Sequence, residues 1–267
     1  MDNILEVKGL TVDIGEKRVI DDVSFTLYPG VVTALVGESG CGKTMTALSV
    51  LNLLPESARV SKGNILFKGS DITVMSPGMS RRIRGRDIGM VFQEPFMALN
   101  PVMRISEQIE EVYITHRVCK RPEIRSKIRD LLSTVKLPPD TVYYYPHELS
   151  GGMRQRIMLA MCLACDPELL ILDEPTTALD VSIQKHILDL VRRIQGERGL
   201  SMLFITHDFS VVNMIADKVC VMRNGEIVES GDKNKILREP SHEYTRQLIA
   251  CIPRLGDARD RLPVVSQ

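Results

Sequence analysis

The sequence predicts an α/β protein with a mostly parallel sheet, an N-terminal antiparallel β subdomain and an inserted helical subdomain. Three observations lead to this fold class. Strand patterns fill residues 3–36, strand and helix patterns alternate on both sides of the middle of the chain, and residues 95–165 are helical with proline breakers. A chain of 267 residues with 44% hydrophobic composition is long enough for one large domain with such an insert.

The first third of the chain contains most of the expected strands. Residues 4–14 and 19–30 alternate in polarity, as strands of an edge sheet do, and Pro29-Gly30 marks a turn. Residues 31–37, VVTALVG, are apolar throughout and predict a buried strand. A helix pattern follows Lys43, and residues 63–72 predict another short strand pair.

The remaining elements follow the helical insert. Strand patterns recur at residues 168–175, 201–208 and 218–231, with a helix candidate over residues 182–195. We therefore expect one domain over residues 1–250 and a C-terminal tail over residues 251–267. Within the domain we expect an α/β core of about residues 1–94 and 164–235, and a helical subdomain of about residues 95–163.

Composition limits the function classes. The 34 basic and 34 acidic residues give no overall basic surface for nucleic acid, and we interpret the basic clusters at residues 81–86 and 120–129 as solvated faces. The longest apolar run, residues 157–165, is far shorter than the roughly 20 residues of a membrane helix. The first residues show no secretory core, so we expect a cytoplasmic setting. Cys162 and Cys165 form a CxxC without a second pair, and we interpret them as small core residues.

A phosphate-binding loop is the strongest motif. The stretch GESGCGKT satisfies G-x-x-x-x-G-K-[ST] and lies between the buried strand and the following helix. Its glycines let backbone amides surround phosphates, Lys43 supplies a point charge to the β and γ groups, and the Thr44 hydroxyl can bind Mg²⁺. The predicted nucleotide-binding residues are Gly37, Glu38, Ser39, Gly40, Cys41, Gly42, Lys43 and Thr44.

Polar side chains follow three other apolar strands. Asp173 and Glu174 end LLILDE, His207 ends LFITH and Gln93 ends GMVFQ. Ligands of open α/β sheets bind at the carboxyl ends of strands. We expect Asp173 to hold Mg²⁺, Glu174 to act as base or to orient water, His207 to contact the γ-phosphate, and Gln93 to sense that phosphate and its metal.

A second glycine-rich stretch opens a helix far from the loop. Ser150, Gly151 and Gly152 precede the helical run MRQRIMLAMCLA, and a helix N-terminus favours an anion. No phosphate-binding lysine lies beside them. Two incomplete half-sites explain the pattern: in a head-to-tail dimer, the Ser-Gly-Gly of one chain closes over ATP held by the loop of the other.

These motifs together resemble the ATP-binding subunits of ABC transporters, which have a P-loop (RecA-like) core. The resemblance covers residues 3 to 250, and it rests on the motifs of residues 37–44, 93, 149–153, 171–174, 178–180 and 207. It implies the Walker A, Q-loop, signature, Walker B, D-loop and H-loop roles at these positions. One departure is Ile14, which stands where the family commonly stacks an aromatic residue on adenine.

Two further stretches, residues 91–109 and 239–253, resemble the peptide/nickel importer subfamily, which includes dipeptide and oligopeptide ATPases. The resemblance implies ATP and Mg²⁺ as cofactors and separate integral-membrane permease subunits. It also implies a second ATP-binding subunit, identical or homologous, and an indirect link to an extracytoplasmic solute-binding protein. The chain would sit peripherally on the cytoplasmic face of the inner membrane and energise uptake of peptides, nickel or a related small solute.

Two other readings stay open. A soluble ABC-type ATPase not coupled to transport would normally show paired cassettes, coiled-coil arms or a basic surface. A catalytically silent partner would bind ATP without hydrolysing it, but Lys43, Glu174 and His207 are intact.

Overall fold

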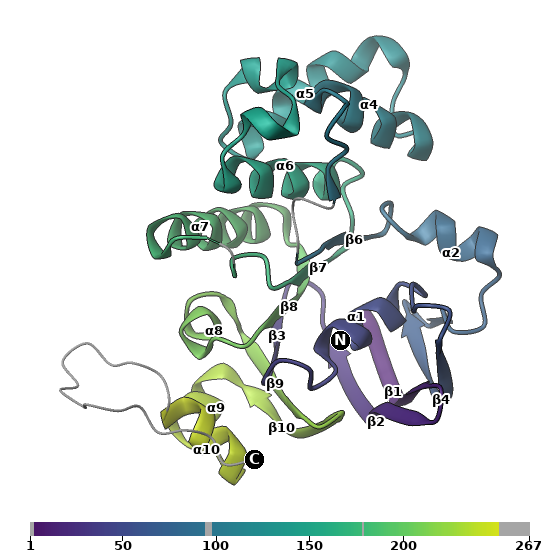
Figure 1. The fold of residues 1–267 in the computed structure, drawn as a ribbon, viewed down its shortest axis with the longest axis vertical. Coiled ribbons are helices and arrows are strands. Elements are labelled where there is room, and N and C mark those ends of the chain that lie inside the picture. The colour runs from purple at the N-terminus through teal and green to yellow at the C-terminus, as the bar shows by residue number, and fades with distance from the viewer. Residues whose placement is uncertain (1–2, 94–97, 178, 251–267) are drawn as a thin grey trace. The chain divides into compact units, whose positions relative to one another are not determined.

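The computed structural model describes residues 3–93, 98–177 and 179–250. The chain divides into two compact units, shown as a ribbon in Figure 1. Unit 1 comprises Met1–Val74 and Leu203–Gln267, and unit 2 comprises Met75–Met202. Unit 2 is therefore larger than the helical subdomain expected over residues 95–163, whose bounds stay a prediction. The predicted tail over residues 251–267 lies outside the described residues.

Unit 1 begins with the predicted antiparallel sheet. Its strand order is β2-β1-β4-β5, and β1, β2 and β4 lie side by side in Figure 1. The strands are β1 (Leu5–Ile14), β2 (Lys17–Leu27), β4 (Ala58–Phe67) and β5 (Ser70–Asp71). Leu5 of β1 pairs with Leu27 of β2 and with Phe67 of β4, so apolar side chains meet at one end of the sheet.

A second sheet of unit 1 carries the expected buried strand. The order there is β10-β9-β3-β8. Strand β9 is parallel to β3 and antiparallel to β10. All five residues of β3 are buried, as its uninterrupted apolar sequence predicts. The strands are β3 (Val32–Val36), β8 (Ser201–Thr206), β9 (Lys218–Arg223) and β10 (Glu226–Asp232).

The described part of unit 1 also contains four helices. They are α1 (Lys43–Val50), α8 (Phe209–Ile215), α9 (Lys233–Arg238) and α10 (Glu243–Ala250). One core cluster joins β3 and β9 to three of them through Phe209 and Val212 of α8, Ile236 of α9 and Tyr244 of α10. The C-terminal helices are thus anchored by burial of apolar side chains.

Unit 2 is mainly helical around one parallel strand pair. Strand β6 pairs with β7 so that Ile88 faces Leu169 and Val91 faces Leu172. Helix α6 packs on β6, and α4, α5 and α6 pack together (Figure 1). The elements are α2 (Pro77–Ile83), β6 (Ile88–Val91), α4 (Ile105–His116), α5 (Ile124–Thr134), α6 (Gly151–Leu163), β7 (Leu169–Asp173) and α7 (Val181–Arg198), with short 3₁₀ turns at Arg121–Glu123, Pro139–Tyr143 and Pro146–Glu148.

The two CxxC cysteines, Cys162 and Cys165, are half-buried at the end of α6. The Cys162 thiol donates to the Met90 carbonyl at 3.1 Å, which ties α6 to β6 and supports its interpretation as a core residue. Burial raises the pKa of Cys162 to about 12 and that of Cys165 to about 11, so neither thiol is a ready nucleophile. Among the described residues, no helix is both long and apolar enough to cross a lipid bilayer.

Candidate nucleotide-binding site

The predicted phosphate-binding loop joins β3 to α1 in unit 1. Helix α1 begins at Lys43, directly after Gly42, whose φ is 111°. A Cβ at Gly42 would lie 2.7 Å from the Met222 Cε, and one at Gly37 would lie 2.2 Å from the Met222 carbonyl oxygen. Gly37 therefore requires glycine because a side chain would collide with the backbone of β9, and Gly42 requires it because of its positive φ.

Lys43 holds the loop in a closed curve. Its side chain is only 5% exposed, and its Nζ donates to the carbonyl oxygens of Gly37 at 2.9 Å and Glu38 at 2.8 Å. The ammonium group is therefore fixed inside the loop, where it can attract a phosphate. Burial raises the pKa of the Cys41 thiol although Lys43 opposes the shift, so Cys41 stays protonated and is a loop residue, as predicted.

Tyr244 of α10 contacts this loop, and sequence reasoning missed it. Its hydroxyl accepts the backbone N–H of Glu38 at 3.3 Å across 206 positions of sequence. The ring is 1% exposed, and the Arg223 guanidinium carbon lies 4.7 Å from the ring centroid. A contact over so long a separation leaves no local signal, so only the fold reveals that α10 supports the loop.

The predicted carboxylates end β7 in unit 2. Asp173 is 1% exposed and Glu174 is 8% exposed. Glu174 has a φ of 46°, a conformation that costs a non-glycine residue of order 1 kcal/mol. Such strain is common where a side chain must be aimed at a reacting group, which agrees with the role predicted for Glu174.

Two donors hold the Glu174 carboxylate. The Gln93 amide Nε2 donates to Oε2 at 3.2 Å, and the Thr177 hydroxyl donates to the same oxygen at 2.9 Å. The structure thus brings together two predicted residues, Gln93 and Glu174. It adds Thr177, which sequence reasoning missed although it follows Glu174 by three positions.

The Ser-Gly-Gly stretch forms the start of α6, also in unit 2. The Ser150 Oγ accepts the N–H of Met153 at 3.3 Å, so this hydroxyl caps its own helix. A Cβ at Gly152 would lie 2.8 Å from Ile183 Cγ2, whereas one at Gly151 would meet Leu179 Cδ2 at an ordinary 3.4 Å. Gly152 is therefore needed for packing of α6 against α7, and Gly151 has room that packing does not explain.

His207 follows β8 in unit 1, and its side chain is exposed. The next residue, Asp208, caps α8 by accepting the N–H of Ser210 at 2.7 Å. Because Asp208 starts the helix, it fixes the backbone at the point where the imidazole emerges. His207 is thus an exposed residue held at a strand end.

The oxygen donors suit Mg²⁺. In the described part of the chain, no three His, Cys, Asp or Glu side chains gather into a metal-binding group. Mg²⁺ does not require one, since it is usually held by one or two carboxylates, waters and substrate phosphates. In unit 2 the Asp173 carboxylate and the Gln93 amide oxygen are hard oxygen ligands of this kind, and in unit 1 the Thr44 hydroxyl is another.

Comparison with known families defines the class of protein. Residues 20–177 match the family described as ABC transporter, and residues 228–267 match the family described as oligopeptide/dipeptide transporter, C-terminal region. The fold agrees: the chain is similar to cbiO1 from Clostridium perfringens, part of the ABC transporter complex cbiONQ. That likeness has a TM-score of 0.78 at 27% identity and covers 90% of this chain and 92% of that one.

Two curated relatives narrow the class. The chain is 44% identical to the dipeptide transport ATP-binding protein DppD of Bacillus subtilis, over 96% of this chain and 78% of the relative. It is 48% identical to a putative peptide import ATP-binding protein of Brucella ovis, over 96% of this chain and 80% of the relative. The chain belongs to the ABC transporter ATP-binding family, in its oligopeptide/dipeptide branch.

Proposed function

We propose that this chain is the ATP-hydrolysing subunit of an ABC importer that takes up peptides through separate permease subunits. The observation that carries the proposal is the presence of two family segments in one chain: the ABC transporter segment and the oligopeptide/dipeptide C-terminal region. The named relatives handle peptides, so we favour peptides over the nickel alternative.

Unit 1 holds the phosphates in this proposal. The glycine-rich loop presents backbone amides and the Lys43 ammonium to the β and γ groups of ATP. Lys43 Nζ donates to the Gly37 and Glu38 carbonyl oxygens, and these bonds fix the position of its charge in the loop. Little reorganisation is then needed on binding, which is how a preorganised site gains affinity.

Unit 2 supplies the group that acts on water. The Glu174 carboxylate accepts the proton of the attacking water or orients it, and Gln93 and Thr177 hold that carboxylate in place. Catalysis of this kind depends mainly on positioning and on electrostatic stabilisation. His207 is assigned a contact to the γ-phosphate.

Mg²⁺ is assigned to three oxygen donors: Thr44, Asp173 and Gln93. When bound, the ion neutralises charge that develops on the phosphate oxygens. The buried Asp173 carboxylate contributes the formal negative charge that a divalent cation requires.

A second ATP-binding subunit completes the site. We assign Ser150, Gly151 and Gly152 to the ATP of a head-to-tail partner, identical or homologous. The geometry at Gly151 supports this assignment, since a Cβ there would meet Leu179 only at an ordinary 3.4 Å and packing within the chain does not demand glycine. ATP then favours the closed dimer and hydrolysis releases it, because the nucleotide binds the two states with different affinity.

The subunit would work peripherally on the cytoplasmic face of the cell membrane, bound to its permeases and only indirectly linked to a solute-binding protein. Uptake of a labelled dipeptide tests the proposal in cells whose own copy of the chain is replaced by Glu174→Gln. We expect uptake to be lost, while the exposed Glu110→Gln variant supports it fully. Full dipeptide uptake by the Glu174→Gln cells, or a chain that never co-purifies with membranes, would contradict the importer assignment.

A further inference from the structure

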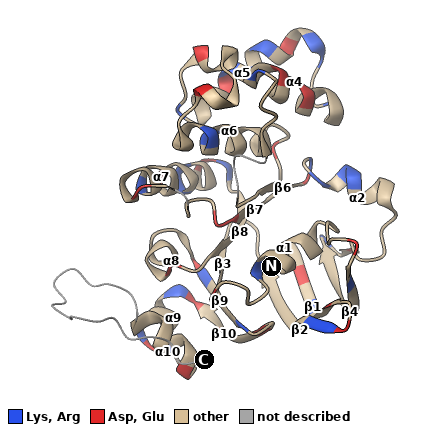
Figure 2. Cartoon of the chain, in the orientation of Figure 1, with Lys and Arg blue, Asp and Glu red and all other residues tan. Residues whose placement is uncertain are grey.

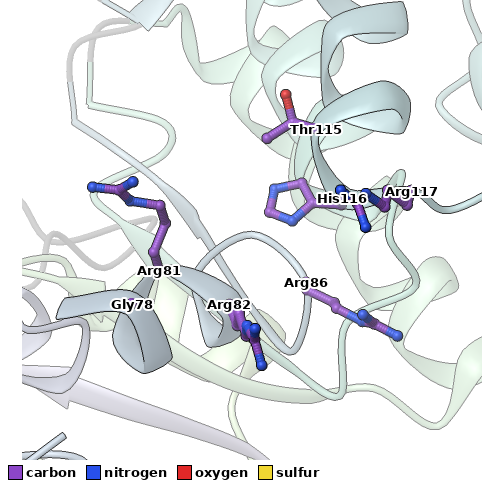
Figure 3. Close-up of a pocket in the computed structure, with 7 residues that line it drawn as sticks. All are labelled: Gly78, Arg81, Arg82, Arg86, Thr115, His116 and Arg117. Atoms are coloured by element: carbon purple, nitrogen blue, oxygen red, sulfur yellow. The ribbon is translucent and has the colours of Figure 1, made fainter. Parts of the chain in front are cut away.

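A basic pocket lies in unit 2, between α2, the turn before β6 and the end of α4. Its volume is about 550 Å³. Figure 3 shows the lining side chains, and Figure 2 shows the basic residues of α2 in blue. The lining consists of Gly78, Arg81, Arg82, Arg86, Thr115, His116 and Arg117.

The charge of this pocket is not balanced by its own lining. The seven lining residues include four arginines and no carboxylate. Within residues 3–93, 98–177 and 179–250, none of the four arginines forms an ion pair, whereas Arg193 and Arg198 of α7 pair with Glu197 and Asp166. Arg81, Arg82 and Arg86 are exposed, as the solvated face predicted at residues 81–86 requires. The fold adds the exposed Arg117, 31 positions after Arg86, to the same cavity.

His116 gives the pocket a polar wall. Its Nε2 would lie 2.9 Å from a Cβ at Gly85, whose φ is +75°, so a glycine turn lets the imidazole approach the backbone. Burial and the Arg86 charge lower the pKa of His116, while Asp87 opposes the shift. The ring is therefore neutral at pH 7 and can donate or accept one hydrogen bond. The Thr115 hydroxyl adds a further donor.

We propose that this pocket binds the phosphate group of a small anion. Guanidinium groups present planar pairs of N–H donors that match phosphate oxygens, and several of them around one cavity can contact more oxygens than a carboxylate offers. A free pyrophosphate-type anion and the headgroup of an anionic phospholipid share this chemistry. The pocket shares no residue with the proposed ATP site. Anion binding there would be an activity additional to the proposed function.

Binding of inorganic pyrophosphate to the full-length protein tests the proposal, with ADP in excess so that the glycine-rich loop is occupied. We expect pyrophosphate to shift the imidazole resonance of His116 and to bind about tenfold more weakly to Arg81→Gln and to Arg86→Gln, since each variant loses one charge-assisted contact. Arg125→Gln, on the exposed face of α5, is the matched control because it removes the same charge outside the lining.

Sedimentation with phosphatidylglycerol vesicles, against phosphatidylcholine vesicles, distinguishes the two sources of phosphate. Binding of pyrophosphate without vesicle binding assigns the pocket to a free anion, and vesicle binding lost in Arg86→Gln but not in Arg125→Gln assigns it to a lipid headgroup. Failure of both probes at physiological salt would overturn the proposal. Equal weakening by Arg125→Gln would also overturn it, because general surface charge would then explain the effect.

Discussion

Individual residues near the proposed chemistry are held by specific partners, and Glu174 is the clearest case. We expect Glu174→Gln to keep ATP affinity and to slow hydrolysis by about 10²- to 10³-fold, because an amide cannot accept the proton of water. Nucleotide binding and single-turnover hydrolysis would be measured on the same protein. Hydrolysis within a few-fold of the unmodified chain would remove Glu174 from the mechanism.

Tyr244 offers a second test at residue scale. Tyr244→Phe removes the hydroxyl that accepts the Glu38 N–H and leaves the buried ring in place. We expect ATP to bind about fivefold more weakly, which corresponds to the net loss of about one hydrogen bond. Tyr143→Phe, at an exposed tyrosine, is the control, and an equal effect of both variants would refute the support of the loop by α10.

His116 should titrate below the ordinary histidine value of 6.5, because burial and Arg86 lower its pKa. The unfolded chain then takes up this proton at higher pH than the folded chain, so this side chain weakens folding as pH falls below about 6.5. The charged groups around it are Arg81, Arg82, Arg86, Asp87 and Arg117. NMR titration should show that Arg86→Gln raises the pKa of His116 and that Arg125→Gln does not.

At the scale of elements, the start of α6 packs against α7 through Gly152. Gly152→Ala should lower the free energy of unfolding by about 1–3 kcal/mol, because its methyl group would collide with Ile183 of α7. Gly196→Ala in α7 meets nothing within 4 Å and should be neutral or slightly stabilising. Denaturant unfolding measures the stability of both variants. If the collision causes the loss, adding Ile183→Ala to Gly152→Ala should recover much of it.

Elements with a local signal were predictable. The apolar run of β3, the glycine-rich loop and α1 follow from a pattern within about 20 residues, and the helix candidate over residues 182–195 is observed as α7. The short helix α2 and the C-terminal α10 were not predicted, since α2 has seven residues and α10 owes its place to burial of Tyr244.

Local sequence signals likewise separate the site residues that could be predicted from those that could not. Lys43, Asp173 and Glu174 could be proposed from the sequence because strand ends and a motif mark them. Thr177 and Tyr244 were missed because a hydrogen-bonded support has no sequence signature of its own. The positive φ of Glu174 also depends on the surrounding fold rather than on the residue type.

At the scale of the whole molecule, the shared-site proposal makes a prediction about pairs of chains. Gly151→Asp should spare ATP binding by the isolated chain and abolish hydrolysis in the assembled pair. The reason is that the new carboxylate would repel the γ-phosphate of the ATP bound to the other chain. Mixing Gly151→Asp with Lys43→Ala chains should restore about one working site per mixed pair. Loss of ATP binding by the isolated Gly151→Asp chain would contradict a site completed in trans.

The hydrogen bond between Glu38 and Tyr244 links the glycine-rich loop to the segment that matches the oligopeptide/dipeptide transporter C-terminal region. Chimeric transporters made by exchanging this C-terminal segment would exchange the tyrosine with it. Nucleotide affinity should therefore change with the donor of the C-terminal segment, even when every residue of the phosphate loop is left untouched.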